Sequence, residues 1–116
     1  MSEKAIVVGV GLKTDSLHEI KESLLELEEL AYAAGAEVVG SLTQVTPKYN
    51  PATLIGTGKV DEVADLVKNT DSKMVIIDHQ LSGAQLRNLE EVLEVKVLVS
   101  NRARVECYFL WERTTM

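Results

Sequence analysis

The sequence has little of several residue types that mark specialised classes of protein. It contains one cysteine, two prolines and one tryptophan in 116 residues. A single cysteine, Cys107, excludes an internal disulfide, so nothing indicates an oxidising compartment. No apolar run approaches the roughly 18 residues of a membrane-spanning helix, and the N-terminus lacks the charged-then-apolar order of a signal peptide. We therefore expect a cytoplasmic protein with no membrane segment.

What the sequence does contain is typical of one ordinary globular domain. Hydrophobic residues make up 46% of the chain and charged residues 26%, and the length is too short for two separate cores. The net charge is −6, although residues 96–116 hold four bases against two acids. An acidic domain is a poor general binder of phosphate backbones, which require dense Lys and Arg. Any contact with nucleic acid is therefore expected to be local.

Alternating apolar patterns predict the fold. Four β-branched apolar runs predict buried strands at residues 4–10, 36–46, 73–78 and 96–99. Apolar residues at helical spacing predict helices from Asp15 or Ser16 to about Ala34, from about Gly58 through Val67, and from Ser82 through Leu93. Strands alternating with helices imply right-handed βαβ crossovers. The expected fold is α/β, a three-layer domain over residues 1–100 with a mainly parallel four-stranded sheet and helices on both faces.

Capping residues and glycines predict where these elements begin, bend and end. Gly35 is expected to be left-handed at the end of the first helix, and Ser82 with Gln85 has the spacing of a capping box. Gly40 predicts a kink in the second strand. The residues of that strand expected to face inward are Val38, Leu42 and Val45. A proline-bounded loop follows, and residues 52–55 are expected to be extended.

Residues 101–116 differ from the rest of the chain in being basic and aromatic. Tyr108, Phe109 and Trp111 lie within four residues, in a chain with three tyrosines, one phenylalanine and one tryptophan. One interpretation is a helical segment that covers the open face of the sheet. The alternative is an exposed aromatic patch that binds a partner or a second copy of the chain, giving a homodimer.

The start of the second predicted helix invites comparison with phosphate-binding loops. It consists of Gly56, Thr57, Gly58 and Lys59. Helix N-terminal N–H groups, close-approaching glycines and a lysine are the parts that hold a phosphate. The Walker A pattern is not met, because Thr53 occupies its first glycine position and Val60 follows Lys59 where a magnesium-binding hydroxyl is required. A glycine turn with a solvated lysine explains the same residues.

Other polar residues give no catalytic or metal signature. Asp78 and His79 end the third predicted strand, where open α/β sheets commonly place ligands, although Asp78 equally suits a turn. His79, His18 and Cys107 share no metal-ligand spacing, so no metal or cofactor is expected. The sequence also lacks a nucleophile elbow and a paired-carboxylate signature. Residue chemistry by itself predicts no catalytic residue.

Two stretches of the chain resemble one protein family. Residues 50–62 (NPATLIGTGKVDE) resemble the P-x-T-x-I-G-x-G-K-v-x-E signature of the N-terminal domain of HflX, a family of ribosome-associated GTPases. Asp78 with residues 81–90 (LSGAQLRNLE) resembles that domain's D-x-x-L-S-x-x-Q-x-R-N-L-E motif, and residues 34–40 are similar to its A-G-A-e-v-v-G. Because order and spacing also agree, the resemblance covers roughly residues 4–98.

The resemblance implies a domain that helps to dock a translational GTPase on the large ribosomal subunit. The family is associated with splitting or rescuing stalled ribosomes, and its N-terminal domain with adenine nucleotides. Its GTP-hydrolysing machinery belongs to a later domain, whose P-loop and guanine-reading motifs have no counterpart here. Where the family usually reads D-R-T, this chain has Val99, Ser100 and Asn101. We expect either a fragment whose GTPase domain follows in cis or a stand-alone homologue that acts with a GTPase in trans.

Three functions remain open on the sequence. The first is a non-catalytic binding module on the large ribosomal subunit, since basic and amide side chains hold phosphates without reading bases. Its candidate RNA contacts are Lys59, Arg87, Asn88, Arg102 and Arg104. The second is a purine-nucleotide (ATP or GTP) binding domain that uses the Gly56–Lys59 loop and Asp78. The third is an oligomerisation domain built on the C-terminal aromatic residues.

Overall fold

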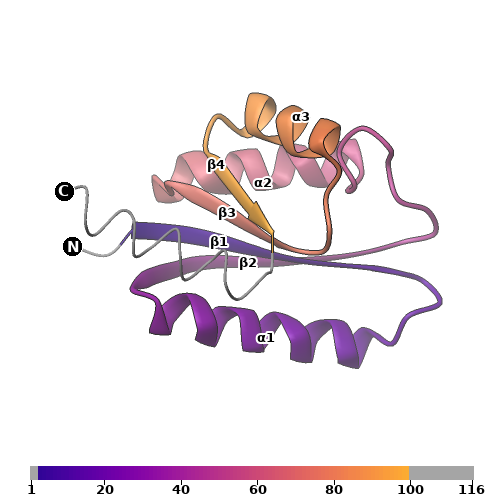
Figure 1. Ribbon diagram of the computed structural model, residues 1–116, viewed down its shortest axis with the longest axis horizontal. Helices are drawn as coiled ribbons and strands as arrows, with labels where there is room; N and C mark the ends of the chain where they lie inside the picture. The colour runs from indigo at the N-terminus through magenta and orange to yellow at the C-terminus, as the bar shows by residue number, and fades with distance from the viewer. Residues whose placement is uncertain (1–2, 100–116) are drawn as a thin grey trace.

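The computed structural model describes residues 3–99, in which strands and helices alternate along the chain (Figure 1). In chain order the elements are β1 (Glu3–Leu12), α1 (Leu17–Ala33), β2 (Ala36–Thr46), α2 (Thr57–Thr70), β3 (Met74–Asp78), α3 (Gly83–Leu93) and β4 (Lys96–Val99). Within these residues, every predicted strand and helix is present within a few residues of its expected ends. The aromatic segment predicted at residues 101–116 lies outside the described residues.

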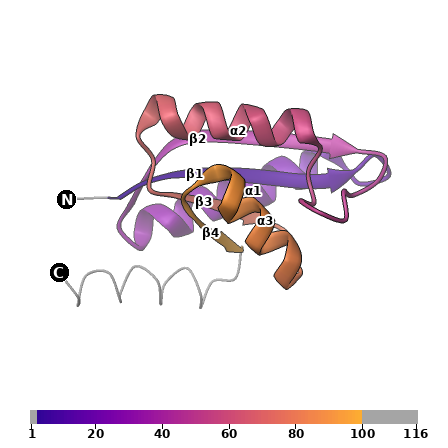
Figure 2. The same ribbon diagram turned by 90° about the horizontal axis from the view of Figure 1, so that it is seen from above.

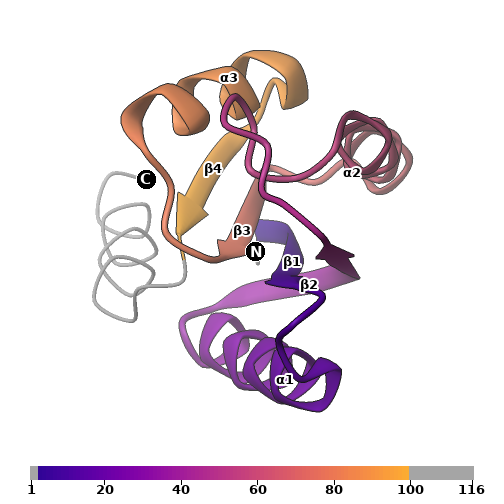
Figure 3. The same cartoon turned by 90° about the vertical axis from the view of Figure 1, so that its right-hand side faces the viewer.

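The four strands form one parallel sheet in the order β2-β1-β3-β4. The chain adds β2 on one side of β1 and then places β3 and β4 on the other side. Because parallel crossovers are right-handed, this reversal puts α1 on one face of the sheet and α2 and α3 on the opposite face (Figure 3). The predicted three-layer α/β fold is confirmed.

Both faces of the sheet are buried, which explains why β1 and β3 are almost continuous apolar runs. The core between the sheet and the α2–α3 layer includes Ile6, Val8, Val63, Val75, Ile77 and Leu89. The core under α1 includes Ala5, Val7, Leu24, Leu27 and Ile76. Neighbouring residues of one strand thus pack into opposite cores, because side chains alternate across the sheet.

The predicted kink in β2 corresponds to a β-bulge. The register with β1 skips Val39, which lies between the paired residues Val38 and Gly40. A Cβ atom at position 40 would lie 2.7 Å from Leu66 Cδ2 of α2. Gly40 therefore lets α2 pack closely against the sheet at the point where the strand is irregular.

One prediction for β2 is wrong: Val45 is 38% exposed rather than inward-facing. Ser41 and Thr43 line a groove with α1, so Val45 belongs to the same α1-facing row of the strand. β2 is the terminal strand of the sheet, and this part of it is not covered by the helix. Alternation along a strand shows which residues share a face of the sheet, but not how far the helix on that face covers them.

The predicted helix ends are confirmed. Ser16 caps α1 by accepting a 3.4 Å hydrogen bond from the Glu19 N–H, and Gly35 after that helix has φ = 104°. Ser82 and Gln85 form a complete capping box at α3. Within residues 3–99, no helix combines the length and the apolar character needed to cross a bilayer.

Candidate functional site

The carboxyl ends of the four strands lie at one edge of the sheet, and the longest connection, residues 47–56, lies there (Figure 2). The winding direction of the chain reverses at β1, so the switch point lies between β1 and β3. Open α/β sheets commonly bind ligands outside the strand ends at such a point. The candidate site is therefore this edge, formed by the loops after β1, β2 and β3.

The loop after β2 is a closed turn rather than the extended segment predicted at residues 52–55. Asn50 N donates to Leu54 O at 2.9 Å, and Leu54 N donates to Asn50 O at 2.7 Å. The Asn50 side chain also accepts a hydrogen bond from Ala52 N. This is the turn chemistry expected of an Asn-Pro pair, and it overrides the extended preference of the short apolar segment that follows.

Two buried side chains hold that loop to the core. Leu54 has φ = 66°, a backbone conformation that leucine rarely adopts, and is only 2% exposed. Ile55 is 1% exposed. Both pack into the core beneath α2 and α3. Burial of the Leu54 side chain thus offsets the strain of its backbone.

Polar side chains of α3 tie the loop down from the other side. Gln85 Nε2 donates to Asn50 O at 3.2 Å, and Asn88 Nδ2 donates to Ala52 O at 2.9 Å. On the side of β2, Gly56 N donates to the Gln44 side chain at 2.9 Å. The two sequence motifs, residues 50–62 and 78–90, therefore hold each other in place, and we call them together the braced edge.

Within the braced edge, the glycine loop begins α2. Gly56 is the N-cap and provides no side-chain cap, and Gly58 has open space around it. The ammonium of Lys59 lies 2.9 Å from the Glu62 carboxylate, and its side chain is only 19% exposed. The first-turn N–H groups thus resemble an anion site, but the lysine beside them already has a carboxylate partner.

A tyrosine lies across the switch point. The ring of Tyr49, in the β2–α2 loop, makes an edge contact with that of His79 after β3, with centroids 4.6 Å apart. Burial, and secondarily the carboxylate of Asp15 after β1, raises the pKa of Tyr49 above its usual value. Tyr49 is therefore close to both loops that flank the crevice. Asp78, the predicted ligand at the end of β3, is half-buried and has no hydrogen bond or ion pair to the glycine loop within residues 3–99.

The predicted RNA contacts differ in how available they are. Arg87 is exposed on α3, whereas the Asn88 amide donates to the loop. Arg102 and Arg104, like the aromatic residues of the C-terminal segment, lie outside the described residues. Sequence reasoning missed Lys48, an exposed base in the loop after β2. Nothing in its sequence context marks it, because its position depends on how the loop folds.

Charge separates this edge from α1. The segments 13–16, 47–59 and 78–88 contain the bases Lys13, Lys48, Lys59 and Arg87 and the acids Asp15 and Asp78. α1 contains the glutamates Glu19, Glu22, Glu26, Glu28 and Glu29 and a single base, Lys21. In these loop segments the bases outnumber the acids, so an approaching polyanion would be repelled less there than at α1. In the described part of the chain, no group of three or more His, Cys, Asp or Glu residues could hold a metal ion.

Comparison with known proteins identifies similar sequences. The family described as GTP-binding GTPase N-terminal matches residues 21–103. A GTPase HflX of Caldanaerobacter subterraneus subsp. tengcongensis is 44% identical over 96 residues, which cover 83% of this chain and 22% of that protein. The GTPase HflX of Escherichia coli is 36% identical over 96 residues, with the same coverage of 83% and 22%. The chain thus spans about a fifth of the length of the curated relatives it matches.

A solved structure has the same fold. The C-terminal catalytic domain of ISC1926 TnpA, an IS607-like serine recombinase, superposes with a TM-score of 0.62 over 97% of this chain and 81% of that one. At 16% sequence identity, this likeness concerns the fold alone.

Proposed function

Because this chain belongs to the HflX family of GTPases, in which it corresponds to the N-terminal domain, we propose that it docks such a GTPase on the large ribosomal subunit. In this role the chain is a binding module without a reaction centre, and it acts in the cytoplasm. The GTPase domain that it serves is attached in cis or associates in trans.

The observation that carries the proposal is the mutual bracing of the two motifs. The side-chain amides of Gln85 and Asn88 donate to backbone carbonyls of the loop after β2, and Tyr49 lies across the switch point. In a catalytic site, such amide and phenol groups would point at a substrate. Here they contact the protein itself and fix the shape of its surface. A surface with such a fixed shape suits docking, since little ordering remains to be done on binding.

The charges of this surface agree with an RNA partner. Lys48, in the loop after β2, and Arg87, on α3, are both exposed and belong to the two segments that the Gln85 and Asn88 hydrogen bonds join. Arg87 has no ion-pair partner among residues 3–99. Exposed bases on a rigid support hold phosphates and set orientation. Lys59 and Asn88 contribute through their contacts within the chain, which shape the same surface.

The test is cosedimentation of the purified chain with large ribosomal subunits over a salt series. Arg87→Ala is expected to weaken binding several-fold and to reduce the slope of log affinity against log salt by about 1, because one phosphate contact is lost. Lys48→Ala is expected to do the same. The matched control is Lys68→Ala, an exposed lysine in the last turn of α2 at the opposite edge of the sheet, which should leave binding unchanged.

Two results would contradict the docking proposal. One is absence of cosedimentation even at low salt. The other is an equal loss of binding for Arg87→Ala and Lys68→Ala, which would mean that any surface base contributes and that the braced edge has no special part.

Nucleotide binding at the start of α2 remains a second candidate. The uncapped first turn and the open space at Gly58 favour it. The ion pair between Lys59 and Glu62 opposes it, because the lysine would have to leave a carboxylate 2.9 Å away to reach a phosphate. Calorimetry with ATP and with GTP decides between the two: binding that is lost in Lys59→Ala supports a nucleotide site, and no heat at millimolar ligand ends this candidate.

A further inference from the structure

The exposed side of α1 contains an ordered stripe that the docking role does not use. Its members are Leu17, Lys21, Leu25, Glu28 and Tyr32, spaced by four, four, three and four residues, so they share one flank of the helix. Leu25 is 59% exposed and Tyr32 is 74% exposed, which is unusual for large apolar side chains grouped together. We call these five residues the α1 stripe.

The α1 stripe borders the free edge of the sheet. A groove of about 330 Å³ separates α1 from β2, and Lys21, Leu24, Leu25 and Glu28 line it with Ser41 and Thr43. Figure 3 shows β2 at the edge of the sheet with α1 beneath it. On the outer side of β2, no strand of residues 3–99 pairs with it.

This edge also lacks the usual protection against pairing. Natural edge strands carry lysines, prolines or bulges that discourage another strand from adding. The bulge of β2 is at Val39, and the five residues from Ser41 to Val45 (SLTQV) are regular, uncharged and free of proline. A further strand can therefore pair along this segment without meeting a charge.

The α1 stripe of one chain is complementary to the α1 stripe of a second chain that runs antiparallel to it. If two α1 helices lie antiparallel with their centres between Leu24 and Leu25, Lys21 faces the partner's Glu28, and Leu17 faces the partner's Tyr32. Every opposite pair is then either apolar with apolar or base with acid. Among residues 3–99, neither Lys21 nor Glu28 has an ion-pair partner within its own chain. This match is what an isologous two-fold interface requires.

We propose that a second copy of this chain docks on the α1 stripe and the free edge of β2. The two copies are related by a two-fold axis, with α1 antiparallel to α1 and residues 41–45 of β2 antiparallel to those of the partner, so that the two sheets become one. The other glutamates of α1, such as Glu22 and Glu26, belong to a different side of the helix and stay in water. The interface is distinct from the C-terminal aromatic patch considered from the sequence and from the braced edge.

Sedimentation velocity and light scattering of the full chain over a dilution series give the oligomeric state. A concentration-dependent dimer is expected for the natural sequence. Leu25→Glu should raise the dimer dissociation constant about a hundredfold, because the residue lies at the centre of the interface and is altered in both copies. Val92→Glu is the matched control: Val92 of α3 is a similarly exposed apolar residue, at 52%, on the opposite layer, and its replacement should leave the dimer intact.

A charge-reversal cycle tests the orientation of the two helices. Lys21→Glu and Glu28→Lys should each weaken the dimer about tenfold or more, since each change creates two like-charge contacts per dimer. The double variant with both changes should recover most of the natural affinity. Glu26→Lys, an exposed reversal outside the stripe, controls for the change in net charge.

Zero-length carbodiimide crosslinking adds a direct readout. Lys21 and Glu28 are seven residues apart on one helix, about 10 Å, a distance that their extended side chains can just span, so isotope labels are needed to show that a crosslink joins two molecules. A mixture of ¹⁴N- and ¹⁵N-labelled chains should therefore give mixed-isotope Lys21–Glu28 peptides. A monomer at every concentration, a dimer indifferent to Leu25→Glu, or a double charge variant no better than the singles would each overturn the proposal. Ribosome binding by Arg87 variants is measured separately, so one proposal can fail without the other.

Discussion

The connections between strands and helices differ between the amino edge and the carboxyl edge of the sheet. At the amino edge, each helix reaches the next strand through two or three residues, because α1, α2 and α3 end just before β2, β3 and β4. At the carboxyl edge the connections run through residues 13–16, 47–56 and 79–82, and side-chain amides brace the longest of them, residues 47–56. Short connections only join the elements, whereas long braced ones form a surface of fixed shape.

A positive φ angle occurs at both edges of the sheet but has a different role at each. Leu54 at the carboxyl edge and Asp71 and Glu94 at the amino edge all have positive φ, at 66°, 55° and 57°. Asp71 and Glu94 are exposed and merely end α2 and α3, whereas Leu54 is buried. At the carboxyl edge the positive φ places the Leu54 side chain in the core. At the amino edge the same backbone conformation only reverses the chain at the end of a helix.

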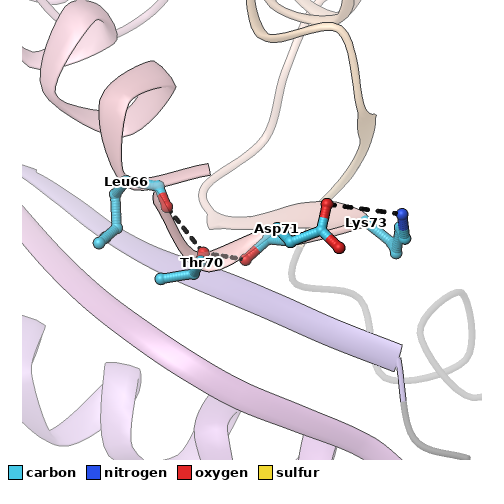
Figure 4. A network of polar contacts seen from close by, with 5 residues as sticks. Leu66, Thr70, Asp71 and Lys73 are labelled. Atoms are coloured by element: carbon cyan, nitrogen blue, oxygen red, sulfur yellow. Dashed lines mark hydrogen bonds and ion pairs between the residues drawn. The ribbon is translucent and has the colours of Figure 1, made fainter. Parts of the chain in front are cut away.

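Around Asp71, the contacts are local to the turn (Figure 4). Thr70 Oγ1 donates to Leu66 O at 2.7 Å within α2, and the Lys73 ammonium lies 3.8 Å from the Asp71 carboxylate, with both groups largely exposed. Exposed ion pairs of this length contribute little to stability. The amino edge thus tolerates substitution that the carboxyl edge should not.

The largest effect is expected for Leu54→Ala. Removing this buried side chain should lower the free energy of unfolding by about 2–5 kcal/mol, since a cavity forms and the backbone strain remains. Urea denaturation followed by circular dichroism measures it. Leu54→Met keeps the volume and should cost less than about 1.5 kcal/mol. Equal costs for the two variants would show that packing at position 54 does not anchor the loop.

The next effect is expected at Gln85, which both completes the capping box and holds Asn50 O. Gln85→Ala should lower the free energy of unfolding by about 1–2 kcal/mol, because both hydrogen bonds are lost. Gln85→Glu retains an acceptor for Ser82 N but cannot donate to Asn50 O, so its cost should be smaller. The difference between the two variants, measured by the same denaturation, separates the cap from the brace.

At the amino edge, substitution at a residue with positive φ should increase the free energy of unfolding instead of lowering it. Glu94→Gly should raise the free energy of unfolding by up to about 1 kcal/mol, because glycine adopts positive φ without the Cβ penalty and Glu94 is exposed. Asp71→Gly should gain less, since aspartate tolerates this conformation better than glutamate. Thermal unfolding of both variants, compared with Leu54→Gly, which should be strongly destabilised, gives the result. A destabilised Glu94→Gly would contradict this view of the amino edge.

The smallest effect concerns alkaline pH at the carboxyl edge. Burial, and then Asp15, raises the pKa of Tyr49, so the folded protein holds its phenolic proton more tightly than the unfolded chain does. The resulting stabilisation is complete below the ordinary pKa of 10.0 and is lost as pH rises through the higher folded value. Stability measured from pH 8 to 12 should therefore fall less steeply in Tyr49→Phe. Identical profiles would show that Tyr49 is not shielded at the switch point.

Prediction from the sequence succeeded where local chemistry decides. The periodicity of the α1 residues and the capping pair Ser82 and Gln85 have one favourable local solution, and the structure adopts it. Prediction failed at Val45 and at residues 52–55. The exposure of Val45 depends on how far the start of α1 reaches over β2, and the turn at residues 50–54 depends on a buried Leu54 that no local preference would place at positive φ.

For the candidate site, too, one part could be predicted from the sequence and another part could not. The family motifs mark two segments that the structure brings together, and two residues predicted as ligand contacts have partners within the chain: Lys59 pairs with Glu62, and Asn88 donates to Ala52 O. Their assignment as phosphate or RNA contacts stays a prediction. Gln44 and Tyr49 could not be selected in advance, because their partners, Gly56 and His79, are distant in sequence and meet them only when the loop after β2 folds.

The order of strands and helices, their caps and the family to which the chain belongs were already determined by the sequence, because spacing and short-range hydrogen bonding act between residues close along the chain. Tertiary structure alone decided which loops meet at the carboxyl edge and that the α1 stripe borders an unpaired strand. These relations join residues that only the crossovers of a parallel sheet bring together.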